Sequence, residues 1–350
     1  MNEIKEIVLK IKKGTVSWLD LKNLTQNQYE EFLRYAYNLK KHFFGNELKI
    51  YIPNKQFPAI SITGSECALN CEHCNKKYLE SMRDITNPND LKNFLKDLHK
   101  NNGIGALISG GCDPDGAVPL DDYLDVIKEI KEDTNLIINT HTGLINKNTA
   151  EMLAQSKIDI VSFDVNVDED VIKDIYHLKK EVRDYKMAIE LLQQHNLNIV
   201  PHICIGLFYG KINKELETIN FIKQTFTEPD LIVIIALIPP KKSSYQFEMP
   251  SPVNISKLIA MTRILFPKTE ISLGCMRPRG NVKAKLEKLA IKAGINRIEI
   301  PSRKSLNWIL EYDPRIKFQF FSACCAIPPK YEEIAKSKGS DLKVYQNYLE

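Results

Sequence analysis

From residue 59 onward, the sequence alternates between short runs rich in β-branched residues and longer stretches with the apolar spacing of amphipathic helices. The predicted strands are Ala59–Thr63, Ile104–Ser109, Leu136–Thr140, Ile160–Asp164, Ile199–Ile203, Leu231–Leu237, Ile271–Leu273 and Arg297–Ile300. The predicted helices are Asp90–Lys100, Leu120–Lys131, Thr149–Ser156, Lys186–His195, Lys214–Phe226, Asn254–Leu265, Val282–Ala293 and, after the last strand, Ser305–Tyr312. Such alternation indicates an α/β fold with a parallel sheet, and eight units favour a closed (β/α)8 barrel of the TIM type over an open doubly wound sheet.

The barrel is expected to carry an extension at each end. Residues 1–50 have helical spacing and are predicted to form an N-terminal helical extension, and residues 51–317 form the barrel. Residues 318–350, which include Cys324 and Cys325, are predicted to form a C-terminal extension that covers the barrel mouth. Reactive groups of such barrels lie on loops at the carboxyl ends of the strands, so this mouth is where the active site is expected.

Composition narrows the classes of partner and compartment. The net charge of +4 is mildly basic, which suits an acidic protein partner or an anionic small molecule and gives no indication of nucleic-acid binding. No apolar stretch reaches the length of about 18 residues that a membrane span needs, and the N-terminus lacks a signal-peptide core. The expected location is therefore the cytoplasm, where the eight cysteines are expected to be metal ligands or buried thiols and not disulfides.

Three cysteines lie close together directly after the first predicted strand, in the run Cys67-Ala-Leu-Asn-Cys71-Glu-His-Cys74. Thiolates at these spacings can bind three irons of a [4Fe–4S] cluster and leave the fourth iron without a protein ligand. That open iron can be chelated by the amino and carboxylate groups of S-adenosylmethionine, whose sulfonium one electron then cleaves to give a carbon radical. The cofactor supplies the difficult chemistry, and the protein positions and shields it.

Two other interpretations of the three cysteines remain open. A structural zinc site needs a fourth cysteine or histidine nearby, and the local candidate, His73, lies between two of the cysteines in an awkward position. An electron-carrying ferredoxin has a fourth cysteine in its motif and a much shorter chain.

On these residues, the sequence resembles the radical S-adenosylmethionine (radical SAM) superfamily over roughly Pro58 to Ser302. The resemblance implies that His73, before the third cysteine, lies near the adenine, and that Ser109-Gly110-Gly111 binds the methionyl amino group. The usual acidic residue after these glycines is Cys112 here. The resemblance also implies that Asp164 or Asn166 contacts the ribose. Two further candidate cofactor contacts lie on segments that resemble the family: Gly206 on the fifth-strand segment and Ile238 after the sixth strand.

Five cysteines remain, and a second, auxiliary iron–sulfur cluster could use some of Cys112, Cys204, Cys275, Cys324 and Cys325. Each is as readily explained as a small buried hydrophobic residue. Resemblance to biotin synthases implies such a sulfur-donating cluster: Cys112 has about the spacing of one ligand, and Arg277 is in register with their arginine ligand. A surface salt bridge is the alternative for Arg277. The sequence departs from that pattern at Thr140-His141-Thr142, where biotin synthases have a cysteine, and at Cys204, which aligns only with a shift.

Within that subgroup, the run Ser109 to Leu120, the run Leu273 to Pro278 and the cysteine-bearing tail resemble the two-component lipoyl synthases. This resemblance implies sulfur insertion into an octanoyl chain held on a lipoyl carrier protein, with a paralogous radical SAM protein as partner and an external electron donor. Two alternatives stay open. One is a radical SAM enzyme of the same fold that assembles a cofactor, methylates or rearranges its substrate, and the other is a non-enzymatic iron–sulfur or zinc protein.

Overall fold

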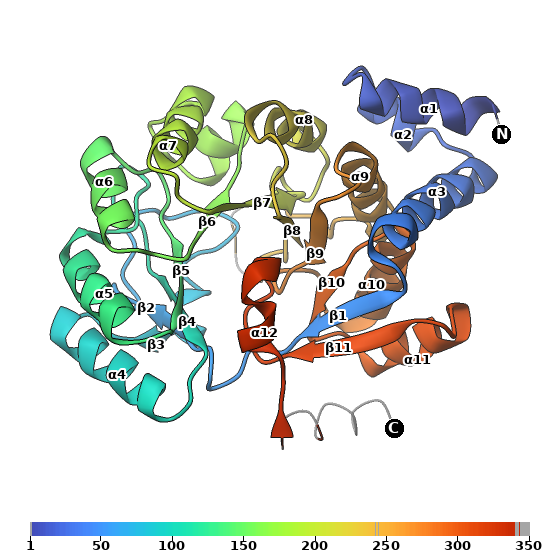
Figure 1. Ribbon diagram of the computed structural model, residues 1–350. Coiled ribbons are helices and arrows are strands. Elements are labelled where there is room, and N and C mark those ends of the chain that lie inside the picture. Colours follow the sequence, from blue (N-terminus) through green and yellow to red (C-terminus); the bar gives the residue numbers. More distant parts are fainter. Residues whose placement is uncertain (1, 242, 244, 340–342, 344–350) are drawn as a thin grey trace.

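The computed structural model describes residues 2–241, 243, 245–339 and 343. Its strands form one sheet in the order β11-β1-β10-β9-β8-β7-β6-β5-β4-β2-β3, and every pairing between them is parallel (Figure 1). The strands are β1 (Glu47–Tyr51), β2 (Ala59–Ser61), β3 (Arg83–Asp84), β4 (Gly105–Ser109), β5 (Ile137–His141), β6 (Ile160–Asp164), β7 (Ile199–Ile205), β8 (Leu231–Ala236), β9 (Glu270–Leu273), β10 (Arg297–Glu299) and β11 (Lys317–Phe321).

The helices α4 to α11 lie on the outer face of the curved sheet, α1 to α3 lie beyond one side of it, and the short helix α12 lies inside its curve (Figure 1). They are α1 (Asn2–Lys12), α2 (Trp18–Lys22), α3 (Gln26–Phe44), α4 (Pro88–Lys100), α5 (Asp121–Asp133), α6 (Lys147–Gln155), α7 (Val182–Gln194), α8 (Glu215–Thr225), α9 (Pro252–Leu265), α10 (Lys283–Lys292), α11 (Arg303–Tyr312) and α12 (Glu332–Ala335). Helix α9 is buried from Ile255 to Leu265 because α1, α3, α8 and α10 all pack on it. No helix in the described ranges is both long and apolar enough to cross a bilayer.

Local sequence signals explain where several helices begin. Ser17 and Asp20 form a capping box at α2, and Thr25 and Gln28 form another at α3, so each pair satisfies backbone N–H groups that lack helical partners. Asn87 caps α4, whose first residue is a proline, a residue that has no N–H to leave unpaired. These capping residues therefore fix the residue at which each of the three helices begins.

The parallel α/β barrel-type fold predicted from the sequence is confirmed, and all eight predicted strands are present. Three further strands are β1, β3 and β11, and of these β1 and β11 cross the boundaries predicted at residues 50/51 and 317/318. Strand β1 pairs with β10 on one side and with β11 on the other, so that Lys49 lies opposite both Arg297 and Gln319. The sheet therefore draws on both segments that the sequence assigns to extensions.

The sheet has two edges, β3 and β11, that do not pair with each other among the described strands. The described part of the tail lies inside the curve of the sheet, where Ala323, Ala326 and Ile327 pack against residues of several strands. Tyr331 reaches Asp159, which directly precedes β6, and Glu332 of α12 reaches Lys49 of β1. The tail was predicted to cover the mouth at the carboxyl ends, but its described residues 326–335 fill the amino-terminal end of the barrel instead, because this end offers both apolar residues and cations.

Candidate active site

The loop between β2 and β3 carries Cys67, Cys71 and Cys74, all half-buried at the carboxyl end of the sheet. A tight turn brings the N–H of Cys74 to the carbonyl oxygen of Cys71 at 3.1 Å. The N–H of Cys112, just after β4, donates to Sγ of Cys67 at 3.3 Å. The thiol of Cys71 approaches the carbonyl oxygen of Tyr176 at 3.7 Å. The three predicted cluster ligands thus face one region and are held by two neighbouring loops.

Gly111 is required by the close approach of this loop to the turn after β4. A Cβ at position 111 would stand 2.0 Å from the carbonyl oxygen of Glu66 and 2.5 Å from Cβ of Cys67. The N–H of Gly111 donates to Oγ1 of Thr63 at 2.7 Å, which fixes the turn against the end of β2. Only glycine fits here without displacing backbone, so the pair Gly110-Gly111 is more than an ordinary tight turn.

The thiols fit an iron–sulfur cluster better than a single ion. In the described part of the chain, no three His, Cys, Asp or Glu side chains meet closely enough to hold one metal ion. Burial, and then the charges of Cys74 and Cys67, raise the pKa of Cys71, so the three sulfurs share one electrostatic environment. A set made only of thiols, spread around a common centre, matches a cluster that contains several irons.

A cavity of about 170 Å³ adjoins the cysteine loop. Its walls come from that loop, from the ends of β5 and β6, and from the turn and helix that follow β6. The lining includes Cys71, His73, Cys112, His141, Asp164, Tyr176 and Tyr185. Cofactor-sized sites are concave and mostly apolar with a few convergent polar groups, and this cavity has that character.

His73 forms one wall with a neutral ring. Its imidazole lies against Tyr176 with ring centroids 5.4 Å apart, and Nδ1 is buried without a hydrogen-bond partner. Burial lowers the pKa of His73 to about 4, so the ring carries no charge at neutral pH. The orphaned nitrogen and the flat uncharged face suit a heterocyclic ligand such as adenine.

Two more histidines lie deeper along the same side of the barrel. Nδ1 of His141 is 3.1 Å from Oγ of Ser109, and the rings of His141 and His202 are 6.0 Å apart. Burial lowers the pKa of both imidazoles, that of His202 to about 4. Ser109 therefore has its hydroxyl engaged by His141 in addition to its place in the predicted cofactor turn.

The remaining predicted cofactor residues divide between the cavity and its surroundings. Asp164 lines the cavity and is exposed at the end of β6. Asn166 is buried behind it, and its Oδ1 accepts the N–H of Asp168 at 2.9 Å. Gly206, with φ of +83°, donates its N–H to Glu215 at 2.8 Å, and Ile238 is half-buried after β8. Neither Gly206 nor Ile238 is among the described residues that line the cavity.

The five other cysteines do not form one group. Cys112 joins the cysteine loop, and Cys204 lies on β7, where burial and the charge of Asp164 raise its pKa. Cys275, just after β9, is exposed and close enough to Cys325 and Glu299 for their charges to interact. Cys324 is half-buried beside Cys325, and its hydrogen bond raises the pKa of the Cys325 thiol. Cys275, Cys324 and Cys325 are called the second thiol group below.

Arg277 is engaged by protein groups and not by the cavity. Its guanidinium donates to Oε1 of Glu287 at 2.8 Å and to the carbonyl oxygens of Gly274 and Glu299, both at 2.6 Å. The arginine and Glu287 are almost completely buried. Arg277 therefore forms a salt bridge, which was the alternative to a ligand role, but this salt bridge lies in the core and not on the surface. Both Nη atoms of the guanidinium are used in these contacts, and Nε is buried without a hydrogen-bond partner.

Sequence reasoning missed three tyrosines around the site. Tyr176 and Tyr185 line the cavity, and Tyr78 follows the third cysteine of the loop. Burial, and then the charges of Cys74, Cys204 and Cys275, raise the pKa of Tyr78. The position of Tyr78, four residues after Cys74, indicates from the sequence that it lies near the cysteine loop. Tyr176 and Tyr185 are far from any motif in the sequence, and only the fold of the segment after β6 brings them to the cavity.

Comparison with known proteins agrees with this geometry. Residues 61–222 match the sequence model of the Radical SAM superfamily. A biotin synthase of Staphylococcus aureus (strain MRSA252) is 25% identical over 300 residues, which cover 83% of this chain and 81% of that protein. A biotin synthase of Staphylococcus haemolyticus is 23% identical over 269 residues, or 75% of this chain and 80% of that protein.

Solved structures show the same fold at low identity. The FeFe-hydrogenase maturase HydG from Carboxydothermus hydrogenoformans superposes with a TM-score of 0.66 at 18% identity, covering 99% of this chain and 89% of that one. Methylornithine synthase gives 0.60 at 16% identity, with 98% and 95% covered. The family match spans β2 to α8 and so includes the cysteine loop, the glycine turn and the cavity. The chain thus contains a Radical SAM domain match over residues 61–222 and is similar to biotin synthases along most of its length.

Proposed function

We propose that this enzyme inserts sulfur into an unactivated C–H position of an octanoyl chain held on a lipoyl carrier protein, as one component of a lipoyl synthase. The observation that carries the proposal is the second thiol group, in which Cys325 lies close enough to Cys275 and to Cys324 for their charges to interact, in addition to the three cysteines of the loop. Similarity to biotin synthases over more than four fifths of the chain supports it.

The residues of the cysteine loop and the cavity have separable tasks in this proposal. Cys67, Cys71 and Cys74 would hold the [4Fe–4S] cluster, which with S-adenosylmethionine supplies a 5'-deoxyadenosyl radical that abstracts hydrogen from carbon. His73 and Tyr176 offer aromatic surface to the nucleoside, and Asp164 offers a carboxylate to ribose hydroxyls. The buried side chains that close the cavity exclude water, which protects a reactive carbon species from side reactions.

The second thiol group would hold the sulfur source, in the form of an auxiliary iron–sulfur cluster. Its thiols come from two segments that are far apart in the sequence, the end of β9 and the tail, and Cys325 lies close enough to Cys275 and to Cys324 for their charges to interact. Tyr78 lies close enough to both Cys74 and Cys275 for the same kind of interaction.

The proposed partners follow from the same chemistry. The carrier protein presents the octanoyl chain, a paralogous radical SAM protein acts with this chain, and an external donor supplies the electron. The mildly basic net charge of +4 would favour association with an acidic carrier domain.

The deciding experiment is anaerobic incubation of the reduced, reconstituted enzyme with an octanoylated lipoyl-domain peptide, with and without the candidate partner, followed by mass spectrometry. We expect a product that has gained sulfur, and about eight irons per chain for two four-iron clusters. Cleavage of S-adenosylmethionine with about four irons and no sulfur-containing product would favour a radical enzyme that makes a different bond. Failure to cleave S-adenosylmethionine would contradict both and leave a non-enzymatic iron–sulfur role.

A further inference from the structure

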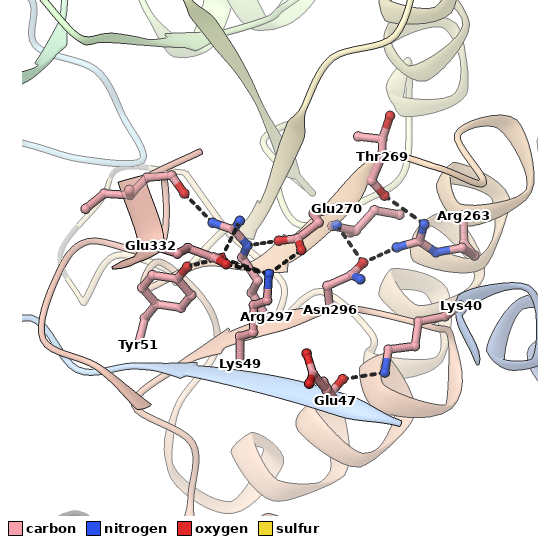
Figure 2. A network of polar contacts seen from close by, with 12 residues as sticks. Lys40, Glu47, Lys49, Tyr51, Arg263, Thr269, Glu270, Asn296, Arg297 and Glu332 are labelled. Atoms are coloured by element: carbon pink, nitrogen blue, oxygen red, sulfur yellow. Dashed lines mark hydrogen bonds and ion pairs between the residues drawn. The ribbon is translucent and has the colours of Figure 1, made fainter. Parts of the chain in front are cut away.

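A buried network of charges joins the tail to the strands β1, β9 and β10 (Figure 2). The carboxylate of Glu332 accepts hydrogen bonds from Nζ of Lys49 at 2.7 and 2.9 Å and from the hydroxyl of Tyr51 at 2.7 Å. It also pairs with the guanidinium of Arg297 at 2.8 Å. Lys49 and Arg297 bind Glu270 as well, so two cations and two carboxylates form a closed set.

The tail supplies one of the two negative charges in this set. Without Glu332, Lys49 and Arg297 would face Glu270 alone, although the side chain of Arg297 is 0% exposed and that of Lys49 is 13% exposed. Burial by itself would raise the pKa of Glu270, but Arg297 and Lys49 hold that pKa below its ordinary value, so the two cations keep Glu270 as an anion. A buried cation without a compensating anion is energetically costly, so docking of the tail stabilises the folded chain.

Contacts on both sides of Glu332 extend this attachment. Arg297 donates to the carbonyl oxygen of Ile327, and Tyr331 donates to Oδ1 of Asp159 at 3.2 Å. Ser322 and Ser337 bond to Ala335 and Phe320 through backbone N–H groups at 2.9 Å each. These bonds close the segment Ser322–Ser337 into a loop that begins and ends beside β11.

The closed segment carries Cys324 and Cys325 at its start. Cys325 is 4% exposed and lies beside Ser272 on β9, and the N–H of Ala326 points to Sγ of Cys324 at 3.5 Å. Ala323, Ala326 and Ile327 are small or apolar, so they fill the interior but offer no directional contact. The directional contacts that set the depth of the segment come from the charged network.

We propose that Glu332 is a positioning residue, which anchors the tail as an internal plug and thereby holds Cys324 and Cys325 opposite Cys275. The second thiol group is then assembled only when the tail is docked, because two of its three members belong to the segment that Glu332 anchors. This proposal goes beyond sulfur insertion: it concerns how the thiols are placed, whichever reaction they serve.

The test is hydrogen–deuterium exchange of the full-length protein, read by mass spectrometry on peptides that cover residues 322–337. We expect Glu332→Gln to speed exchange in these peptides by about tenfold or more, as a loss of about 1.4 kcal/mol in the docked state would. Peptides from α4 to α7 should exchange at the unchanged rate. Glu333→Gln is the matched control, because that neighbouring side chain is 90% exposed, and it should behave as the unmodified chain does.

A charge-matched variant covers the case in which Glu332→Gln unfolds the protein. In Lys49→Met combined with Glu332→Gln, Arg297 keeps Glu270 as its partner, so no unpaired charge remains, but the tail has lost its anchor. Faster exchange confined to residues 322–337 in this variant supports the proposal. Unmodified exchange there in both variants overturns it, and so does an equal rise across the whole chain in the charge-matched variant. Because the readout is amide exchange, this outcome is independent of whether a sulfur-containing product is found.

Discussion

The two halves of the barrel interior are filled in opposite ways. Toward the carboxyl ends of β5 and β6, His141 and Asp164 border an open cavity, and the buried imidazoles of His141 and His202 are uncharged at neutral pH. Toward the amino ends of the strands, the tail of the chain occupies the space and packs against residues of several strands. Its Glu332 joins a charged network with Glu270, Arg297 and Lys49. One half therefore contains a cavity that could hold a cofactor, and the other half is filled by the cysteine-bearing segment of the chain itself.

This difference suggests that the two halves have separate tasks, and variants in one half or the other can test whether the tasks are independent. If the open half binds the radical-generating cofactor and the filled half carries the sulfur source, loss of one should leave the other intact. Loss of Arg297, the fully buried cation that pairs with both carboxylates of the charged network, should instead lower the stability of the whole chain.

The largest effect is expected from Cys71→Ala, which should abolish cleavage of S-adenosylmethionine and remove about four irons per chain, because the cluster loses one of its three ligands. Cys325→Ala should keep that cleavage and lose only the sulfur-containing product. Iron analysis and quantification of 5'-deoxyadenosine measure both. If Cys325→Ala abolished cleavage as completely as Cys71→Ala, the division between the halves would be wrong.

The next effect concerns the charged half. Arg297→Met should lower the free energy of unfolding by about 3–5 kcal/mol, because it leaves two buried carboxylates with Lys49 as their remaining cation. Urea denaturation measures the change. Lys214→Met is the control: Lys214 and Glu217 lie 3.2 Å apart with about half of each side chain exposed, and loss of this pair should cost less than about 1 kcal/mol. Equal costs for the two variants would show that burial of the network contributes little.

The uncharged half should be the acid-sensitive one. Burial lowers the pKa of His202 from 6.5 to about 4 in the folded chain, so between these values the unfolded chain binds a proton that the folded chain does not. Stability should therefore fall as pH drops from about 6.5 to about 4, by an amount on the order of 2–3 kcal/mol.

Urea denaturation of His202→Gln across this pH range should show a smaller loss than the unmodified chain does. His99→Gln, which changes an exposed histidine on α4, should retain the full loss. A steep loss that persists unchanged in His202→Gln would assign the acid sensitivity to other groups.

The smallest effect is expected at the turn between the two loops of the open half. Gly111→Ala should cost about 1–3 kcal/mol, because its Cβ meets the backbone of Glu66 at 2.0 Å. The Cβ of Gly110→Ala would meet side-chain atoms, those of Thr63 at 3.0 Å and of Ile62 at 3.3 Å, and this variant should cost less. Thermal unfolding ranks the two variants, and the reverse order would mean that the loop with Cys67 adjusts freely.

The sequence predicted the open half better than the filled half, and the reason is physical. The strands β5 to β8 are rich in Ile and Val, and the cysteine spacing is local, so both patterns were visible. Strand β1 was missed because its residues Glu47, Lys49 and Tyr51 alternate with Leu48 and Ile50. Charged residues directly after a predicted helix are typical of a solvent-exposed segment and not of a buried strand. Their partner Glu332 lies 283 residues from Lys49 in the chain, and no local pattern reveals such a pairing.

The cavity shows the same limit. The roles predicted for His73 and Asp164 rest on positions relative to a motif, and both residues do line the cavity. Tyr176 and Tyr185 have no such motif, because the π-helical turn Val171–Ile175 that places Tyr176 depends on packing. Arg277 illustrates the opposite error: its register with a ligand in relatives was visible, but its engagement with Glu287 depends on α10, which only the fold brings near.

The two edges of the unclosed sheet also bear on solubility. An exposed strand edge can pair with another chain and start aggregation, and natural proteins shorten, charge or cover such edges. Here β3 consists of Arg83 and Asp84, two exposed charged residues, and the other edge at Phe321 is met by an antiparallel bridge from Lys336. The tail that carries the cysteines therefore has a second consequence: it makes the end of β11 unavailable to neighbouring molecules, so that release of the tail would expose a strand edge as well as two thiols.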